Sequence, residues 1–209
     1  MHKTYLLGNS GYAQECFAQF VLGGVIKDFG GFLILKNNKL ILINEEGVDD
    51  FKYPDKSAFV LATRQPVWRN KFLEHLFKIY EKDINHFPNI VSNEAYLAQT
   101  SRLGVGNVLN CFAMINANTE IGNFNLLNCY ASLHHDVKIG DHNIFATYAT
   151  ALGYNNVGDY NWLDSGATVS QRINIGDNNT LSSGEHLFED MNDGQLFQHG
   201  LIIENVSKE

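Results

Sequence analysis

The chain has 209 residues, of which 44% are apolar and only 18% are charged, and its formal net charge is −8 at pH 7. This length suits one large domain or two small ones with a buried core, and the negative charge without a run of Lys and Arg argues against a non-specific nucleic-acid or anionic-membrane binder. The sequence shows neither an apolar stretch long enough to span a membrane nor a leader-like start. Its three cysteines lack CxxC spacing and favour a reducing compartment over disulfides or a thiolate zinc site. We therefore expect a soluble cytoplasmic protein.

Short and helix-length apolar runs alternate before residue 84. Strands are predicted at residues 4–7, 31–35, 40–43 and 58–62, and helices are predicted at residues 13–22 and 68–80. The first strand enters the turn Gly8-Asn9-Ser10-Gly11. A strand, a glycine-rich turn, a helix and a strand in this order are typical of a small parallel α/β domain of the Rossmann-like kind, which we expect over residues 1–83.

A six-residue period replaces the helical spacing after residue 84. Every sixth residue from Val91 to Leu187 is apolar, which makes 17 positions in succession. The segments that start at residues 103, 121, 139, 157 and 175 each begin with an aliphatic residue and Gly and have Asn in fifth place, so the full repeat is 18 residues. Such a repeat describes a triangular solenoid with three short strands per coil and a rise of about 4.8 Å per coil.

We expect the repeated Gly and Asn residues to occupy the turns, because Asn tolerates a positive φ and Gly has no side chain to restrict it. The pattern resembles that of hexapeptide-repeat proteins. This resemblance implies a left-handed parallel β-helix, which we expect over residues 84–192, with a C-terminal tail at residues 193–209.

The segment LHHDVKIG at residues 133–140 carries the strongest chemical signal. With the Gly-Ser turn and the segment FPNIVSNEAYLA at residues 87–98, the layout resembles bacterial sialic-acid O-acetyltransferases and bacillosamine-type sugar-nucleotide N-acetyltransferases. The resemblance implies a head that binds a nucleotide-linked sugar, a solenoid that binds acetyl-CoA, and His135 as general base with Asp136 raising its basicity. Acyl transfer requires a deprotonated nucleophile, and a carboxylate on the far ring nitrogen fixes the imidazole tautomer. A solvated turn histidine at this position, or His134 as the base, remains an alternative.

Counting by the repeat places further residues near His135. Gly153 follows it by 18 residues, so it is expected one coil away, at about 5 Å. A glycine N–H is a suitable donor to the oxyanion of a thioester, and the resemblance implies that this glycine contacts acetyl-CoA; a plain turn glycine is the alternative. A neighbouring column contains Thr147, Ser165 and Ser183. We expect Ser165 and Ser183 to line the groove of the pantetheine arm.

The resemblance also assigns a ligand to the head. It implies that Ser10, Gly11 and Tyr12 contact the sugar nucleotide, where a helix N-terminus favours pyrophosphate. The family usually has two Asp residues after its second strand and a Gly after a later one, and here Lys36, Asn37 and Arg64 stand at those places. We expect all three near the same ligand, with both cations favouring phosphate; two ordinary solvated cations are the alternative.

The preferred function is therefore acetyl-CoA-dependent N-acetylation of a nucleotide-linked amino sugar of the 4-amino-4,6-dideoxyhexose type, in bacterial glycan or O-antigen biosynthesis. We expect a homotrimer, because flat solenoid faces need partners to form deep grooves. O-acetylation of a sialic-acid-like sugar and a non-catalytic solenoid remain alternatives. A zinc enzyme of the carbonic anhydrase kind is disfavoured, and no metal is expected, because the solenoid histidines lack the spacing of such a site.

Overall fold

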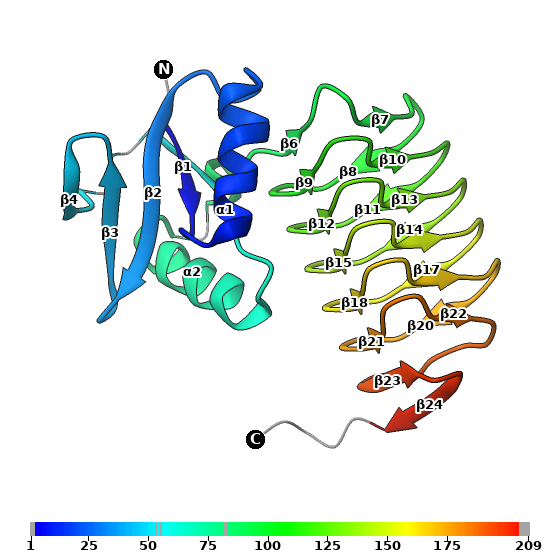
Figure 1. The fold of residues 1–209 in the computed structure, drawn as a ribbon. Coiled ribbons are helices and arrows are strands. Elements are labelled where there is room, and N and C mark those ends of the chain that lie inside the picture. Colours follow the sequence, from blue (N-terminus) through cyan, green and yellow to red (C-terminus); the bar gives the residue numbers. More distant parts are fainter. Residues whose placement is uncertain (1–2, 53, 55, 82, 205–209) are drawn as a thin grey trace. The chain divides into compact units, whose positions relative to one another are not determined.

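The computed structural model describes residues 3–52, 54, 56–81 and 83–204. The chain divides into two compact units, residues 1–93 and residues 94–209, which are drawn in Figure 1. This division lies beyond the boundary at residue 84 that the sequence suggested. The short 3₁₀ helix η2 (Ile84–His86) packs against β5 (Ser57–Val60), since His86 Nδ1 lies 2.7 Å from the Ser57 carbonyl oxygen and the Phe59 and Phe87 rings are 5.9 Å apart.

The first unit is built on a five-stranded sheet in the order β4-β3-β2-β1-β5. Besides β5 and η2, its elements are β1 (Lys3–Leu7), α1 (Gly11–Cys16), the π-helix η1 (Phe17–Leu22), β2 (Phe29–Lys36), β3 (Lys39–Asn44), β4 (Gly47–Asp50), α2 (Pro66–Ile79) and β6 (Ile90–Val91). The parallel sheet expected from the sequence is confirmed for its centre, where β1 pairs with both β2 and β5.

Strands β3 and β4 add an antiparallel edge that the sequence analysis did not anticipate. The cause is the two-residue turn Asn37-Asn38, in which both residues have a positive φ, 49° and 57°. Turns of this type suit the twist of two strands that run in opposite directions, and asparagine tolerates the conformation. The turn therefore reverses the chain directly after β2 and fixes β3 beside it.

The second unit is a left-handed parallel β-helix with three faces. One face contains β7 (Tyr96–Leu97), β10 (Met114–Ile115), β13 (Ser132–Leu133), β16 (Thr150–Ala151), β19 (Thr168–Val169) and β22 (His186–Leu187). The next face contains β8 (Arg102–Leu103), β11 (Glu120–Ile121), β14 (Lys138–Ile139), β17 (Asn156–Val157) and β20 (Asn174–Ile175). The third face contains β9 (Val108–Leu109), β12 (Leu126–Leu127), β15 (Ile144–Phe145), β18 (Trp162–Leu163), β21 (Thr180–Leu181), β23 (Gln195–Gln198) and β24 (Leu201–Glu204).

The strand register confirms the 18-residue repeat. Leu133 pairs with Ile115 on one side and with Ala151 on the other, and the same offset holds on each face through β22. The last coil is two residues shorter, because Leu181 pairs with Phe197. Residues 195–204, which were expected in a tail, instead form β23 and β24, and β24 runs antiparallel to β23; residues 205–209 lie outside the described residues.

The expected role of the repeated asparagines was wrong. The positive φ angles at this corner belong to the residue before each asparagine, as at Phe124 (55°), His142 (62°) and Tyr160 (58°). The asparagines are buried and form a ladder through the coils, in which the N–H of Asn143 donates to Asn125 Oδ1 at 2.7 Å and the N–H of Asn161 donates to Asn143 Oδ1 at 2.8 Å. Their function is to satisfy backbone groups inside the solenoid.

The expected reason for the repeated glycines, conformational freedom in a turn, was also wrong. Gly140 has no positive φ, but a Cβ atom there would overlap the Asp159 carboxylate of the next coil. That carboxylate accepts the Asp141 N–H at 2.7 Å. Glycine is therefore needed for close approach between coils and not for its conformational freedom.

Candidate active site

His135 and Asp136 form a hydrogen-bonded polar pair at a corner of the solenoid. They follow β13, at a corner where Asp136 adopts the left-handed conformation with φ 58°. This conformation turns the carboxylate toward its neighbour, and Asp136 Oδ2 lies 2.9 Å from His135 Nδ1. The side chains are 43% and 34% exposed, so a ligand in solution can reach both.

The hydrogen bonds around Asp136 fix its charge state. The bond to His135 comes first and the bond from Asn118 Nδ2, at 3.2 Å to Oδ1, comes second in holding the pKa of the Asp136 carboxyl below its usual value. The group is therefore an ionised acceptor at neutral pH. Because a carboxylate accepts only, the imidazole places its proton on Nδ1 and its lone pair on Nε2.

Gly153 lies directly against the imidazole ring, one coil beyond His135. A Cβ atom at this position would stand 2.8 Å from His135 Cε1 and 2.9 Å from Nε2, which is closer than side-chain atoms approach one another. The absence of a side chain is thus what makes room for the ring. Among the described residues, none accepts a hydrogen bond from the Gly153 N–H, while the Gly153 carbonyl oxygen accepts the Arg172 N–H at 3.1 Å.

Three further residues surround the pair, and the sequence analysis did not select them. Asn118, Tyr154 and Arg172 lie in the column of Asp136, at multiples of 18 residues from it. The Tyr154 ring meets the His135 ring edge-on with centroids 5.0 Å apart, and the Arg172 guanidinium carbon lies 5.0 Å from the Tyr154 centroid. Counting from Asp136 instead of His135 would have found all three.

His134 occupies a different environment from His135. Its N–H donates to the Ala151 carbonyl oxygen at 2.9 Å within the ladder of the face. Burial, followed by the nearby His135, lowers the pKa of the His134 imidazole. The carboxylate of Asp136 contacts His135, the histidine that the sequence analysis preferred as base.

The column of Thr147, Ser165 and Ser183 lies at another corner of the solenoid. The Gly166 N–H donates to the Thr147 carbonyl oxygen and the Gly184 N–H donates to that of Ser165, both at 2.9 Å, so the column is continuous. Ser183 Oγ donates to Asp164 Oδ2 at 2.8 Å. The three residues thus lie in one column, and among the described residues none of their hydroxyls forms a hydrogen bond with His135.

The head contains a cleft of about 490 Å³ at the glycine-rich turn. Of the six residues predicted to contact substrate, Ser10, Gly11, Tyr12 and Arg64 line this cleft, and the Arg64 guanidinium carbon lies 5.6 Å from the Tyr12 ring centroid. Helix α1 begins at Gly11 and continues without a break into η1. Lys36 does not line the cleft, because it pairs with Lys39 at the end of the β2–β3 hairpin.

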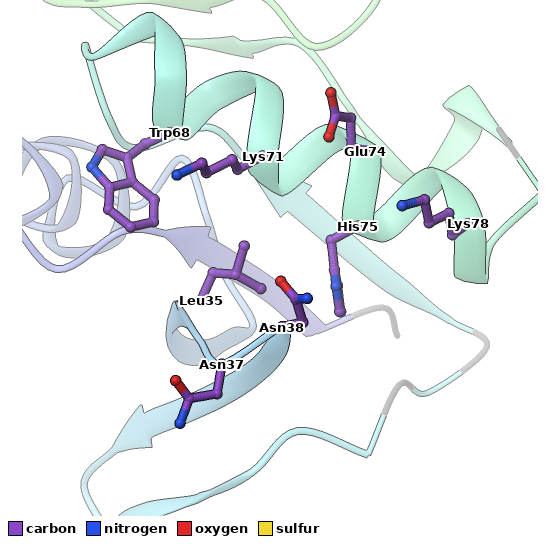
Figure 2. Close-up of a pocket in the computed structure, with 8 residues that line it drawn as sticks. All are labelled: Leu35, Asn37, Asn38, Trp68, Lys71, Glu74, His75 and Lys78. Carbon is purple, nitrogen blue, oxygen red and sulfur yellow. The ribbon is translucent and has the colours of Figure 1, made fainter.

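A second cleft of about 780 Å³ lies between α2 and the same hairpin (Figure 2). Asn37 lines it, together with residues that the sequence analysis missed: Asn38, Lys71, Glu74, His75 and Lys78. Leu35 and Trp68 line both clefts, so the two are neighbours on the surface of the head. Burial, with Lys78 as the lesser cause, lowers the pKa of His75.

A buried cation lies beneath the first cleft. Arg69 is only 2% exposed, and its Nη1 donates to the carbonyl oxygen of Thr63, a residue of the cleft wall, at 3.1 Å. Burial lowers the pKa of Arg69 to about 10, so the guanidinium stays charged at neutral pH. Its place on the apolar stripe of α2 with Phe72, Leu73 and Leu76 is the sequence signal that could have revealed it.

In the described ranges, His, Cys, Asp and Glu side chains do not gather in groups of three or more that could hold a metal ion. Within those same residues, each helix is too short or too polar to cross a bilayer.

Comparison with known proteins gives a likeness of fold. No protein-family model and no curated protein sequence matches the chain. WeeI from Acinetobacter baumannii aligns over 97% of this chain and 100% of its own, with a TM-score of 0.82 and 20% identity. A mutant of perosamine N-acetyltransferase from Caulobacter crescentus, in complex with CoA and GDP-perosamine, aligns over 94% and 93% with a TM-score of 0.77 and 20% identity. The acetyltransferase domain of PglB from Neisseria gonorrhoeae, in complex with acetyl coenzyme A, aligns over 93% and 95% with a TM-score of 0.74 and 16% identity.

Proposed function

We propose that the chain is an acetyl-CoA-dependent N-acetyltransferase that acts on a nucleotide-linked amino sugar of the 4-amino-4,6-dideoxyhexose type. The observation that carries the proposal is the His135–Asp136 pair at 2.9 Å with Gly153 against the ring. The fold supports it, since the perosamine enzyme and the PglB domain share it and their structures contain CoA or acetyl-CoA. We place the reaction in the bacterial cytoplasm, in glycan or O-antigen synthesis.

His135 acts as the general base in this proposal. The Nδ1 proton points at Asp136, so Nε2 takes the proton from the sugar amine as the amine attacks the thioester carbon. The Asp136 carboxylate stabilises the imidazolium that forms, and the Gly153 N–H donates to the oxygen that becomes negative. The imidazolium then returns its proton to the departing CoA thiolate. Ser165 and Ser183 line the pantetheine groove of this proposed site.

The head supplies acceptor recognition in the proposal. The cleft at Ser10, Gly11 and Tyr12 receives the pyrophosphate, with Arg64 at its wall and the charged Arg69 below. The neighbouring cleft carries Lys71 and Lys78 beside Glu74, so the linings of the two clefts together hold three cations, with Arg64, against two carboxylates, Glu15 and Glu74. This charge favours a phosphorylated acceptor over a free sugar. Lys36 and Asn37 belong to the proposed contacts through the hairpin that borders the second cleft.

Thiol release from acetyl-CoA tests the reaction. We expect turnover with a GDP-, UDP- or dTDP-linked 4-amino sugar and none with the corresponding hydroxy sugar. His135→Ala should lower kcat by about 10²–10⁴-fold while CoA affinity stays nearly unchanged. His134→Ala is the matched control. Near wild-type turnover of His135→Ala would contradict the assignment, and acetylation of the hydroxy sugar alone would make the enzyme an O-acetyltransferase.

Calorimetry with the same nucleotides tests the head separately. A Cβ atom at Gly11 would meet no protein atom within 4 Å, so the fold accommodates a side chain there. Gly11→Val should therefore weaken nucleotide binding by blocking approach to the backbone, and should do so more than Ser10→Ala, which removes one hydroxyl. CoA binding should persist in both variants. Heat from CoA but from no nucleotide would mean that the acceptor is a free sugar.

A further inference from the structure

Two cysteines of adjacent coils lie in direct contact. Cys111 and Cys129 are 18 residues apart and occupy the same place in the repeat, and their Sγ atoms are 3.2 Å apart. Both side chains are partly exposed, whereas Cys16, in the other unit, is buried. Neither sulfur takes part in the proposed acetyl transfer, although the column that the two cysteines occupy continues into Ser165 and Ser183 of the proposed pantetheine groove.

The residues on both sides hold the two sulfurs in register. Before the cysteines, Asn110 Nδ2 donates to Asn128 Oδ1 at 2.9 Å. After them, the rings of Phe112 and Tyr130 stack with centroids 4.9 Å apart and planes 15° from parallel. Three successive pairs of equivalent side chains therefore touch across the coils, and the thiol pair is the middle one. Little side-chain freedom is left for the sulfurs to lose when they react.

The backbone geometry suits a covalent bond between the sulfurs. Equivalent residues of neighbouring coils are spaced at about 4.8 Å, as paired strands are, and the Cα atoms of disulfide-linked residues are usually about 4.4–6.8 Å apart. The Tyr130 N–H donates to the Cys111 carbonyl oxygen at 3.2 Å and ties the coils together at this point. The coil spacing therefore lies within the Cα range of disulfides, and the sulfurs must close from 3.2 Å to about 2.0 Å for the bond to form.

The packing of the column does not itself require sulfur. The next residues of the same column are Thr147, Ser165 and Ser183, which carry hydroxyl groups in the equivalent places. The first two coils thus differ from the later ones in having a side chain that can be oxidised. What needs an explanation is that two oxidisable side chains, Cys111 and Cys129, lie in contact with each other.

We propose that Cys111 and Cys129 are a modification site, a dithiol that a low-molecular-weight disulfide converts into a covalent link between adjacent coils. The thiolate of one cysteine attacks the small disulfide, forms a mixed disulfide and releases one thiol. The second cysteine then attacks the protein sulfur of that mixed disulfide and releases the other thiol. One small disulfide is reduced to two thiols while the two protein thiols are oxidised to one disulfide, and no other electron acceptor is needed.

The link closes a loop of 18 residues and joins two coils that otherwise separate when the solenoid unfolds. We expect the oxidised protein to unfold at a temperature higher by several degrees, the usual scale for a loop of this length in a domain of this size. A small thiol in excess reverses the change, since the same exchange runs backward.

Treatment of the folded protein with oxidised glutathione at mildly alkaline pH tests the proposal. Alkylation with N-ethylmaleimide after denaturation should then fall from three labelled cysteines to one, with Cys16 keeping the label. The intact mass should decrease by two hydrogen atoms, and a non-reducing peptide map should join the peptides of Cys111 and Cys129. Labelling of all three cysteines after prolonged treatment would overturn the proposal, as would stable glutathione adducts without the internal link.

Two controls separate pre-organisation from ordinary thiol reactivity. Cys129→Ser keeps a hydroxyl of the kind found at Ser165 and Ser183, and it should stop at a glutathione adduct of Cys111. The wild-type chain unfolded in guanidinium should form the 111–129 link at least about tenfold more slowly than the folded protein, because the folded coils hold the sulfurs together. Equal rates would show that the solenoid contributes nothing to the reaction.

Discussion

At the scale of single residues, Gly153 is the sharpest test of the site's geometry. In Gly153→Ala, the new methyl would stand 2.8 Å from His135 Cε1, so the ring must turn away. We expect kcat to fall about 10- to 100-fold with little change in thermal stability, because the loss falls on the position of the base.

A double-mutant cycle checks this explanation. Adding Gly153→Ala to His135→Ala should cause little further loss, because the ring that the methyl displaces is already gone. Additive losses in the double variant would mean that Gly153 acts through its N–H or through CoA instead.

The carboxylate of Asp136 predicts a pH dependence. The bonds to His135 and Asn118 lower the pKa of this carboxyl. Its contribution to the stability of the folded protein is therefore fully present above the pKa of an unfolded aspartate, and it is lost only as the pH falls through the still lower pKa of the folded state. Protonation of this carboxyl should therefore cost no activity between neutral pH and mild acid. Asp136→Asn should lower kcat at least about tenfold, since the imidazolium that forms during the transfer loses its stabilising charge.

Steady-state kinetics of the two proteins at neutral pH measure this loss. Wild-type kcat in Asp136→Asn would contradict the assignment of the charge.

Sequence reasoning named the central residues of the candidate site but not their surroundings. His135 and Asp136 were selected through the family resemblance of LHHDVKIG, and Gly153 was selected by counting 18 residues along a repeat that has no insertion. The Tyr154 contact and the room that Gly153 leaves for the ring depend on side-chain directions at a corner, which periodicity does not specify. Lys36 was expected in a cleft because of its place in a family pattern, but the turn that follows it directs the chain away.

At the scale of elements, the asparagine ladder determines how the coils hold together. Asn143 is fully buried; its Oδ1 accepts the Asn161 N–H at 2.8 Å and its Nδ2 donates to the Gly158 carbonyl oxygen at 2.9 Å. Asn143→Ala leaves both backbone groups without these partners inside the solenoid. We expect a loss of about 2–4 kcal/mol in the free energy of unfolding, the sum of two buried groups left unsatisfied.

Denaturant unfolding measures this loss, and Asn156→Ala is the matched control. Asn156 is exposed, and its Nδ2 donates to Asn174 Oδ1 at 2.9 Å on the solenoid surface. Its removal should change stability by less than about 0.5 kcal/mol. Equal losses in the two variants would mean that the ladder adds nothing beyond surface hydrogen bonds.

The 18-residue period was predicted correctly, but the reason given for its recurring Asn and Gly residues was wrong. The sequence establishes that Asn and Gly recur every 18 residues, but a recurrence has more than one physical cause. At this corner, bulky residues such as Phe124 and Tyr160 take the positive φ, and the stacking of rings such as Tyr160 on His142, at 4.6 Å, accompanies it. The usual backbone preference of aromatic residues would have excluded them from a position with a positive φ.

At the scale of the whole molecule, we predict a homotrimer. The proposed site presents one polar corner with half-exposed side chains, and closed rings are the usual way for flat solenoid faces to form grooves. Light scattering should give three times the chain mass of 23.5 kDa. A mass equal to that of one chain, at concentrations where the enzyme is active, would contradict the prediction.

The fold class was predictable because both units follow strong local rules, namely alternation of strand and helix in one and a gapless period in the other. The antiparallel edge of the head was less accessible, although Asn37-Asn38 is a recognisable reversing turn. The two-residue shortening of the last coil breaks the period, so the extension to β23 and β24 was missed.

The end of the solenoid has a consequence for polymerisation. A parallel β-helix offers its last strands as a template on which the first coil of another molecule would add, and repeated addition would produce a filament. Here β24 pairs antiparallel to β23, so on that face the terminal edge runs against the direction in which an incoming coil would continue. The reversal of β24 therefore leaves this face without a parallel outer edge on which another coil could add in the same direction.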